Sequence, residues 1–246
     1  MFPPKTVLIT GASRGIGKAT AELFAEKGWN VLINYLNSEE AALALRQKLN
    51  LTLGTAEVFK ADVSKLSQVE QLVAYGLERF GDIDVLVNNA GLAQTGLFGE
   101  ITEAEWDAVL AVNLKGVFNC CQSVLPVMLR KKRGKIINVS SIWGMVGASC
   151  EVSYSTAKAG VIGLTKALSK ELGPSNIQVN CVAPGIIETE MLKHLSPEEM
   201  AELKTETPLQ KIGQPRDVAN TISFLASAEA DFITGQVISP NGGFVI

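Results

Sequence analysis

A tyrosine and a lysine four residues apart, Tyr154 and Lys158, have the types and spacing that acid–base chemistry requires. On a helix, residues i and i+4 leave the same face, so these side chains are expected side by side. A free phenol titrates near pH 10, too high for ready proton exchange at neutral pH. A lysine cation close to the phenolate would stabilise it and lower the pKa of the tyrosine, each unit being worth about 1.4 kcal/mol.

Ser141 precedes this pair and is expected at the end of a strand. Its hydroxyl can donate a hydrogen bond to a carbonyl oxygen. Together with Tyr154 and Lys158 it would form a site that protonates an oxygen while hydride arrives at the adjacent carbon. A Tyr-x-x-x-Lys pair alone is common on helix faces, so this interpretation depends on the elements that position the three side chains.

Short β-branched runs alternate with longer amphipathic segments along the 246 residues. The expected strands are Thr6–Thr10, Val31–Tyr35, Ala56–Ala61, Asp84–Val87, Lys135–Val139, Gln178–Val182 and Gln236–Ser239. The expected helices are Gly17–Lys27, Glu39–Leu49, Leu66–Phe80, Trp106–Arg130, Ser153–Leu172 and Arg216–Ser227. Several strands are apolar throughout, which is typical of strands buried on both faces of a parallel sheet. The alternation predicts a doubly wound α/β fold with helices on both faces, and one domain over residues 1–246.

The segment 188–213 interrupts this rhythm after the sixth strand. It offers two short helical pieces, one of them capped by Ser196-Pro197-Glu198-Glu199. Ligands of such sheets bind outside the carboxyl ends of the strands, so we expect this segment to be a substrate lid. The alternative is that this segment is a surface loop without a role in substrate binding.

A glycine-rich turn, Thr10-Gly11-Ala12-Ser13-Arg14-Gly15-Ile16-Gly17, follows the first strand and opens the first helix. Its glycines allow a tight bend and close backbone approach, and the helix N-terminus offers N–H groups to a pyrophosphate. The second expected strand ends in Asn34-Tyr35-Leu36-Asn37-Ser38, without the acid that usually binds the ribose 2′-OH of NAD. Arg14 can reach a 2′-phosphate, so NADP(H), with Asn37 nearby, is the expected cofactor.

Bulk properties exclude several other classes. A net charge of −3 gives no reason to expect nucleic acid binding, and no run approaches eighteen uninterrupted apolar residues. Pro3 and Pro4 stand where a signal peptide would need an apolar helix, so a cytoplasmic protein is expected. The four cysteines, Cys120, Cys121, Cys150 and Cys181, show no metal-ligand spacing and are expected as buried reduced thiols. The single histidine, His194, lacks the neighbours of a hydrolytic triad.

The motifs together resemble the short-chain dehydrogenase/reductase family over essentially the whole chain. They are TGASRGIG at 10–17, Asp62-Val63, Asn88-Asn89-Ala90-Gly91, Asn113, Ser141, Tyr154-Ser-Thr-Ala-Lys158 and Pro184-Gly185. The resemblance implies a Rossmann fold with seven parallel strands in the order 3-2-1-4-5-6-7 and three αβα layers. It also implies a catalytic tetrad of Asn113, Ser141, Tyr154 and Lys158.

By that resemblance, Tyr154 is the general acid, Ser141 orients the carbonyl, and Lys158 also holds the nicotinamide ribose. Asn113 would keep a water in the proton relay through its main chain. The cofactor would meet Gly11, Ser13, Arg14, Gly15, Ile16, Gly17, Asn37, Asp62, Val63, Asn89, Ala90, Gly91, Tyr154, Lys158, Pro184, Gly185, Ile187 and Thr189. Asp62 is expected at the adenine and Ile187 at the carboxamide.

Within that family the chain is most similar to 3-oxoacyl-[acyl-carrier-protein] reductases, which implies a ketone on a small molecule or a carrier protein as substrate. The basic run Arg130–Arg133 fits either pairing with a helix dipole or a dock for an acidic carrier protein. Trp143, Cys150, Glu151 and Val152, within the segment 140–158, instead resemble the elongation factor P 5-aminopentanone reductases. The alternative is that Trp143 and Cys150 pack under the loop. An NAD(P)-dependent alcohol or sugar dehydrogenase stays a further alternative. The family resemblance suggests a homotetramer.

Overall fold

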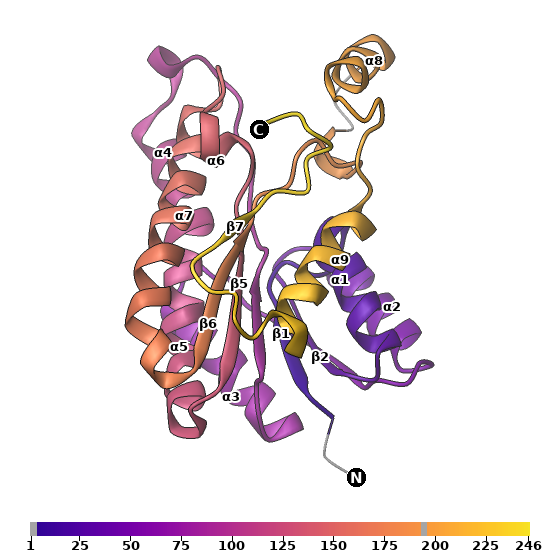
Figure 1. Ribbon diagram of the computed structural model, residues 1–246, viewed down its shortest axis with the longest axis vertical. Coiled ribbons are helices and arrows are strands. Elements are labelled where there is room, and N and C mark those ends of the chain that lie inside the picture. The colour runs from indigo at the N-terminus through magenta and orange to yellow at the C-terminus, as the bar shows by residue number, and fades with distance from the viewer. Residues whose placement is uncertain (1–3, 193–195) are drawn as a thin grey trace.

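The sheet of this protein contains seven parallel strands within the residues described by the computed structural model, 4–192 and 196–246. They are β1 Thr6–Ile9, β2 Asn30–Tyr35, β3 Ala56–Lys60, β4 Val85–Asn88, β5 Gly134–Val139, β6 Ile177–Val182 and β7 Val237–Ile238. Their order is β3-β2-β1-β4-β5-β6-β7 (Figure 1). The predicted doubly wound parallel sheet and its strand order are therefore confirmed.

Helices cover both faces of this sheet. The longer ones are α1 Gly15–Glu26, α2 Glu39–Leu49, α3 Leu66–Phe80, α4 Glu103–Leu110, α5 Gly116–Lys131, α7 Val152–Leu172, α8 Pro197–Glu206 and α9 Pro215–Ala226. The short turns are η1 Phe98–Glu100, α6 Trp143–Val146, η3 Gly173–Ser175, η4 Glu190–Leu192 and η5 Ala228–Ala230. On one side α1 packs on α9, next to α2, and on the other side α3, α5 and α7 pack (Figure 1). This is the expected three-layer αβα arrangement.

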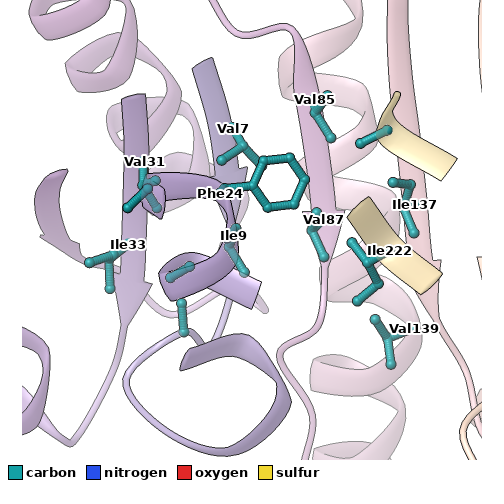
Figure 2. Close-up of a cluster of buried hydrophobic side chains, with 14 of the residues drawn as sticks. Val7, Ile9, Phe24, Val31, Ile33, Val85, Val87, Ile137, Val139 and Ile222 are labelled. Carbon is teal, nitrogen blue, oxygen red and sulfur yellow. The ribbon is translucent and has the colours of Figure 1, made fainter. Parts of the chain in front are cut away.

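The central strands are largely apolar because they contribute to two separate cores. In β1, Val7 and Ile9 face the α1, α2 and α9 side, where Phe24 and Ile222 pack on them (Figure 2). Leu8, between them, belongs to the core under α3, α5 and α7. Successive side chains of a strand point to opposite faces, so a sheet covered on both sides needs apolar residues at every position.

A long helical stretch, 103–131, runs from α4 through a π-helical turn, η2 Ala111–Lys115, into α5. It begins earlier than the expected Trp106, because Thr102 and Glu105 form a reciprocal capping box. By length and composition, it is the one described helix that would be able to cross a membrane, and 44% of its most apolar part is buried. Since α5 packs against α3 in the core, this composition is weak evidence for a membrane span.

The basic run at the end of α5 lies at the amino edge of the sheet. Lys131 Nζ contacts Asp82 Oδ1 at 2.7 Å and Asp84 Oδ1 at 3.2 Å, just before β4 begins. Tyr154 belongs instead to the helix beyond the carboxyl end of β5. A structural role of Arg130–Arg133 at the end of α5 is therefore favoured over a dock for a carrier protein. A carrier protein bound there would sit at the edge opposite to Tyr154.

The segment 188–213 contains two short helical elements, η4 and α8, as expected. Ser196 Oγ accepts a hydrogen bond from Glu199 N at 3.2 Å, and Pro197 occupies the first turn, which confirms the predicted cap. His194, the predicted non-catalytic histidine, lies outside the described residues.

The four cysteines are free thiols. Cys120, Cys121 and Cys181 are buried, as predicted, whereas Cys150 is partly exposed, which corrects the prediction that it is buried.

Candidate active site

Ser141 and Tyr154 meet beyond the carboxyl end of β5. Ser141 comes two residues after the strand and is buried, and Tyr154 lies in the first turn of α7 and is partly exposed. The Ser141 hydroxyl lies close enough to the Tyr154 phenol to lower its pKa. Trp143 N donates a hydrogen bond to Ser141 Oγ at 3.2 Å, which fixes the serine side chain. The structure thus brings together the two hydroxyls that the sequence predicted for carbonyl chemistry.

Lys158 lies one helical turn after Tyr154 and is almost fully buried. Its Nζ donates a hydrogen bond to Val139 O at 2.8 Å and lies 5.6 Å from the centroid of the Tyr154 ring. Burial disfavours the charged form, so the pKa of Lys158 falls to about 8. The predicted common face of Tyr154 and Lys158 is present, with the ammonium seated on a backbone carbonyl.

The expected lowering of the tyrosine pKa is not found in this structure. Burial raises the pKa of Tyr154 to about 12; the Ser141 hydroxyl lowers it by less, and the charge of Glu151 adds a smaller increase. The expectation differs because Lys158 donates to Val139 rather than to the phenol, so its charge does not offset desolvation. Tyr154 is therefore a neutral phenol at pH 7, the form that donates a proton.

Asn113 is fully buried in the π turn η2. Its amide group clamps the main chain of Leu92: Nδ2 donates to Leu92 O at 2.8 Å, and Oδ1 accepts from Leu92 N at 3.1 Å. The neighbouring Gly91 is tightly enclosed, because a Cβ there would lie 2.6 Å from Asn113 Oδ1 and 3.5 Å from Lys158 Nζ. Asn113 thus holds the chain after β4 beside the lysine.

The glycine turn is seated directly on the end of β4. Gly11 has a φ of +60°, and a Cβ there would lie 2.8 Å from Ala90 Cα. A Cβ on Gly17 would lie 2.6 Å from both Asn89 Nδ2 and Gly11 O. Asn89 Nδ2 donates to Thr10 O at 2.9 Å and to Gly11 O at 3.1 Å. Two of the glycines are therefore required by close approach, as the sequence predicted.

Two positioning residues of this turn were missed by the sequence reasoning. Thr10 Oγ1 accepts hydrogen bonds from the N–H groups of Asn89 and Ala90, each at 3.0 Å. Asn34 Oδ1 accepts from Gly11 N at 3.2 Å, and Asn34 Nδ2 donates to Ala61 O at 2.9 Å. A polar residue inside the otherwise apolar strand VLINY was the available signal, because a buried amide needs partners.

Arg14 is the N-cap residue of α1 and is exposed. Its Nη1 donates to Glu190 Oε2 at 2.8 Å, so the guanidinium predicted for a 2′-phosphate has a carboxylate partner in this structure. Asn37 follows β2 and is exposed. The other residues of the turn are less exposed: Ser13 is buried and Ile16 is partly buried.

The other predicted cofactor residues line the same edge of the sheet. Asp62 follows β3, where its Oδ1 accepts from Ser64 Oγ at 2.7 Å, and Val63 is buried beside it. Pro184 follows β6, and its carbonyl accepts from Ile142 N at 3.0 Å. The predicted residues that continue from Pro184 are Gly185, Ile187 and Thr189. Ile187 is buried and pairs with Gly213 in a parallel bridge.

An aromatic wall flanks the predicted catalytic side chains. Trp143 begins α6, two residues after Ser141, and its ring packs edge-on against Phe244 of the C-terminal tail, with centroids 5.8 Å apart. Cys150 adopts a φ of +61°, and its carbonyl accepts from Gly96 N at 2.8 Å. The segment before Tyr154 is thereby tied to the loop after β4. Trp143 itself packs against Phe244 within the protein.

Sequence comparisons identify the family to which this chain is similar. The family described as "Enoyl-(Acyl carrier protein) reductase" matches residues 11–245. A Staphylococcus aureus protein named 3-oxoacyl-[acyl-carrier-protein] reductase FabG is 46% identical over 239 residues, covering 97% of each chain. Its namesake from Thermotoga maritima is 43% identical over 242 residues, covering 98% of each chain. A Synechocystis 3-oxoacyl-[acyl-carrier-protein] reductase is 44% identical over 243 residues, covering 98% of this chain and 97% of its own.

The chain belongs to the short-chain dehydrogenase/reductase family. Membership makes it an oxidoreductase that acts on a CH–OH or C=O group with a nicotinamide cofactor. The residues present fit a dinucleotide: the first turn of α1 carries no acidic residue and no side-chain cap, so its N–H groups can meet an anion.

Replacing Gly17 with alanine should destabilise the protein by about 1–3 kcal/mol and weaken binding of nicotinamide cofactors, because the new methyl group would overlap Gly11 O and Asn89. The matched control is Gly163→Ala in α7, where a Cβ meets no atom within 4 Å. That variant should gain stability, by about 0.5–1 kcal/mol. Urea unfolding and cofactor titration would measure both effects, and equal behaviour of the two variants would contradict the tight seating of the turn.

The buried ammonium of Lys158 should make stability depend on pH. Its folded pKa of about 8 lies below the ordinary value of 10.5, so the unfolded chain binds more protons between these values, and stability rises with pH there. Between about pH 7 and pH 9.5 the wild type should gain about 2 kcal/mol relative to Lys158→Met.

Urea unfolding at both pH values would measure this difference. The exposed Lys166 of the same helix provides the control, because Lys166→Met should change with pH as the wild type does. A difference between wild type and Lys158→Met that stays constant with pH would mean that burial does not depress the pKa of Lys158.

Proposed function

We propose that this protein is an NADPH-dependent 3-oxoacyl-[acyl-carrier-protein] reductase. The observation that carries the proposal is the pairing of the Ser141 and Tyr154 hydroxyls beside the buried Lys158. Relatives of that name, identical at 43–46% of positions over nearly the full chain, support the substrate class. The proposed site is the tetrad Asn113, Ser141, Tyr154 and Lys158.

Tyr154 is the proposed proton donor. Its raised pKa of about 12 keeps the phenol protonated at neutral pH, and its partial exposure lets a carbonyl oxygen approach. Ser141, held by Trp143 N, would orient the same carbonyl oxygen and stabilise the negative charge that develops on it. The nicotinamide cofactor, when bound, supplies the hydride that the carbonyl carbon receives.

Lys158 would stabilise the phenolate that remains after proton transfer. With a pKa of about 8 it is mostly charged at pH 7, and its Nζ, 5.6 Å from the centroid of the Tyr154 ring, would turn from Val139 O towards the phenolate oxygen. Asn113, clamped to Leu92, would hold the proton relay next to Lys158 through its main chain.

The choice of NADP(H) over NAD(H) rests on Arg14 and on the end of β2. Arg14 is exposed at the start of α1, where a guanidinium can bind a 2′-phosphate with charge-assisted hydrogen bonds. Asn37 stands after β2, where NAD enzymes usually carry an acid. Among the remaining predicted contacts, Asp62 would meet the adenine, and Ile187 would meet the carboxamide.

Two features bear on the substrate. The wall formed by Trp143 and Phe244 would shape the entrance for a ketone, with the segment 188–213 as its lid. Glu151, next to Tyr154, raises the tyrosine pKa and would also favour a cationic substrate. This observation keeps a second candidate, reduction of the 5-aminopentanone modification on elongation factor P. A cytoplasmic homotetramer is the proposed form of the protein in either case.

NADPH oxidation by the purified protein tests the proposal, with acetoacetyl thioester and ketone-bearing elongation factor P assayed side by side. We expect efficient reduction of the thioester and little with the modified factor. The opposite result would assign Trp143 and Glu151 to recognition of the protein substrate. A crotonyl thioester serves as a further arm, because reduction of its C=C bond would instead match the enoyl reductase description of the family.

Tyr154→Phe should reduce turnover by at least a hundredfold, because general acid catalysis contributes about 10²–10⁴-fold. NADPH binding, measured by fluorescence titration, should stay nearly unchanged because the ring and Lys158 remain. The control is Tyr75→Phe, which removes a phenol of α3 that donates to Glu57 of β3. Reduction that survives Tyr154→Phe at more than a few per cent would exclude Tyr154 as the proton donor.

A further inference from the structure

An ion pair ties the segment 188–213 to the glycine turn. Arg14 Nη1 and Glu190 Oε2 are 2.8 Å apart, although the residues are 176 positions apart in the chain. Arg14 is the N-cap of α1, and Glu190 opens η4. Glu190, in the first helical turn of the proposed lid, is therefore paired with Arg14, the side chain proposed to bind the 2′-phosphate of the cofactor.

The position of Glu190 is set by the residues before it. Glu188 N donates to Gly213 O at 2.8 Å, and Gln214 Nε2 donates to Glu188 Oε2 at 2.5 Å. Thr189 Cγ2 lies 3.5 Å from the point that a Cβ of Gly15 would occupy. Glu190 is thus delivered to Arg14 by an anchored stretch of backbone rather than by a long free loop.

We propose that Glu190 is a specificity-determining residue that competes with the 2′-phosphate of the cofactor for Arg14. The inference rests on the proposed use of NADP(H). A carboxylate and a phosphate make the same charge-assisted hydrogen bonds to a guanidinium, so Glu190 occupies a donor that the phosphate needs. A phosphate monoester carries about −1.5 to −2 charges at pH 7 and therefore displaces the single charge of the carboxylate.

The 2′-phosphate is favoured over Glu190 in the competition for Arg14. Both side chains are largely exposed, at 64% for Arg14 and 48% for Glu190, so their ion pair is weak and readily exchanged. A nucleotide with a 2′-phosphate separates η4 from the turn, whereas a nucleotide without that phosphate leaves the ion pair in place. The start of the lid thereby responds to the one group that distinguishes NADPH from NADH.

Calorimetric titration with adenosine 2′,5′-bisphosphate and with 5′-AMP tests this inference, because these probes differ only in the 2′-phosphate. Glu190→Gln should bind the bisphosphate about two- to fivefold more tightly than the wild type, the range expected for an exposed ion pair. Its affinity for 5′-AMP should stay unchanged. The gain should shrink at high salt, where exposed charges are screened.

Glu188→Gln is the matched control, because it removes the same charge two residues earlier, from a carboxylate bonded to Gln214. It should leave both affinities near those of the wild type. In an Arg14→Gln background, Glu190→Gln should no longer change bisphosphate affinity, because the shared guanidinium is gone.

The outcomes separate the two proposals. A wild type that binds the bisphosphate and 5′-AMP equally would overturn the assignment of NADP(H) itself. A wild type that prefers the bisphosphate, with no gain in Glu190→Gln, would leave that assignment intact and overturn the competition. An equal gain in Glu188→Gln and Glu190→Gln would also overturn it, because general charge removal would then be sufficient.

Discussion

The close contact between the glycine turn and the end of β4 is the constraint on which the rest of the site depends. β1 and β4 are neighbours in the sheet but lie more than seventy residues apart in sequence. Gly11 and Gly17 allow the turn to lie against Ala90 and Asn89 without a side chain between them. This contact fixes the cofactor half of the molecule relative to the half that carries Ser141, Tyr154 and Lys158.

Three of the proposed catalytic side chains are held by hydrogen bonds to main-chain groups. Lys158 is bound by Val139 O, Ser141 by Trp143 N, and Asn113 by both main-chain groups of Leu92. Each anchor is a main-chain group at or just beyond the end of a strand. These side chains are thus oriented in advance by the sheet, and in the proposed reaction a substrate does not have to order them.

The fold was predictable because its signal is periodic and local. Short β-branched and largely apolar runs identified the strands, and turn glycines identified the phosphate end. The tyrosine–lysine spacing likewise put Tyr154 and Lys158 on one helical face. These features depend on residues close to each other in the chain.

Other features depended on long-range pairing and could not be read in advance. The direction of the Tyr154 pKa shift reflects which acceptor Lys158 finds, and Val139 is nineteen residues away. The Arg14–Glu190 ion pair joins segments whose relative positions only the complete fold determines. Asn34 is intermediate, since its polar type inside an apolar strand was visible but its partners were not.

The π turn η2 has a consequence for how this site can be lost. A π turn contains one residue more than the α-helical turn that would replace it. Asn113 lies inside this turn, which spans Ala111–Lys115. Deleting a single codon within 111–115 would restore an uninterrupted α-helix and rotate Asn113 away from Leu92. One small genetic event would thereby break both hydrogen bonds between Asn113 and Leu92, and with them the role proposed for Asn113.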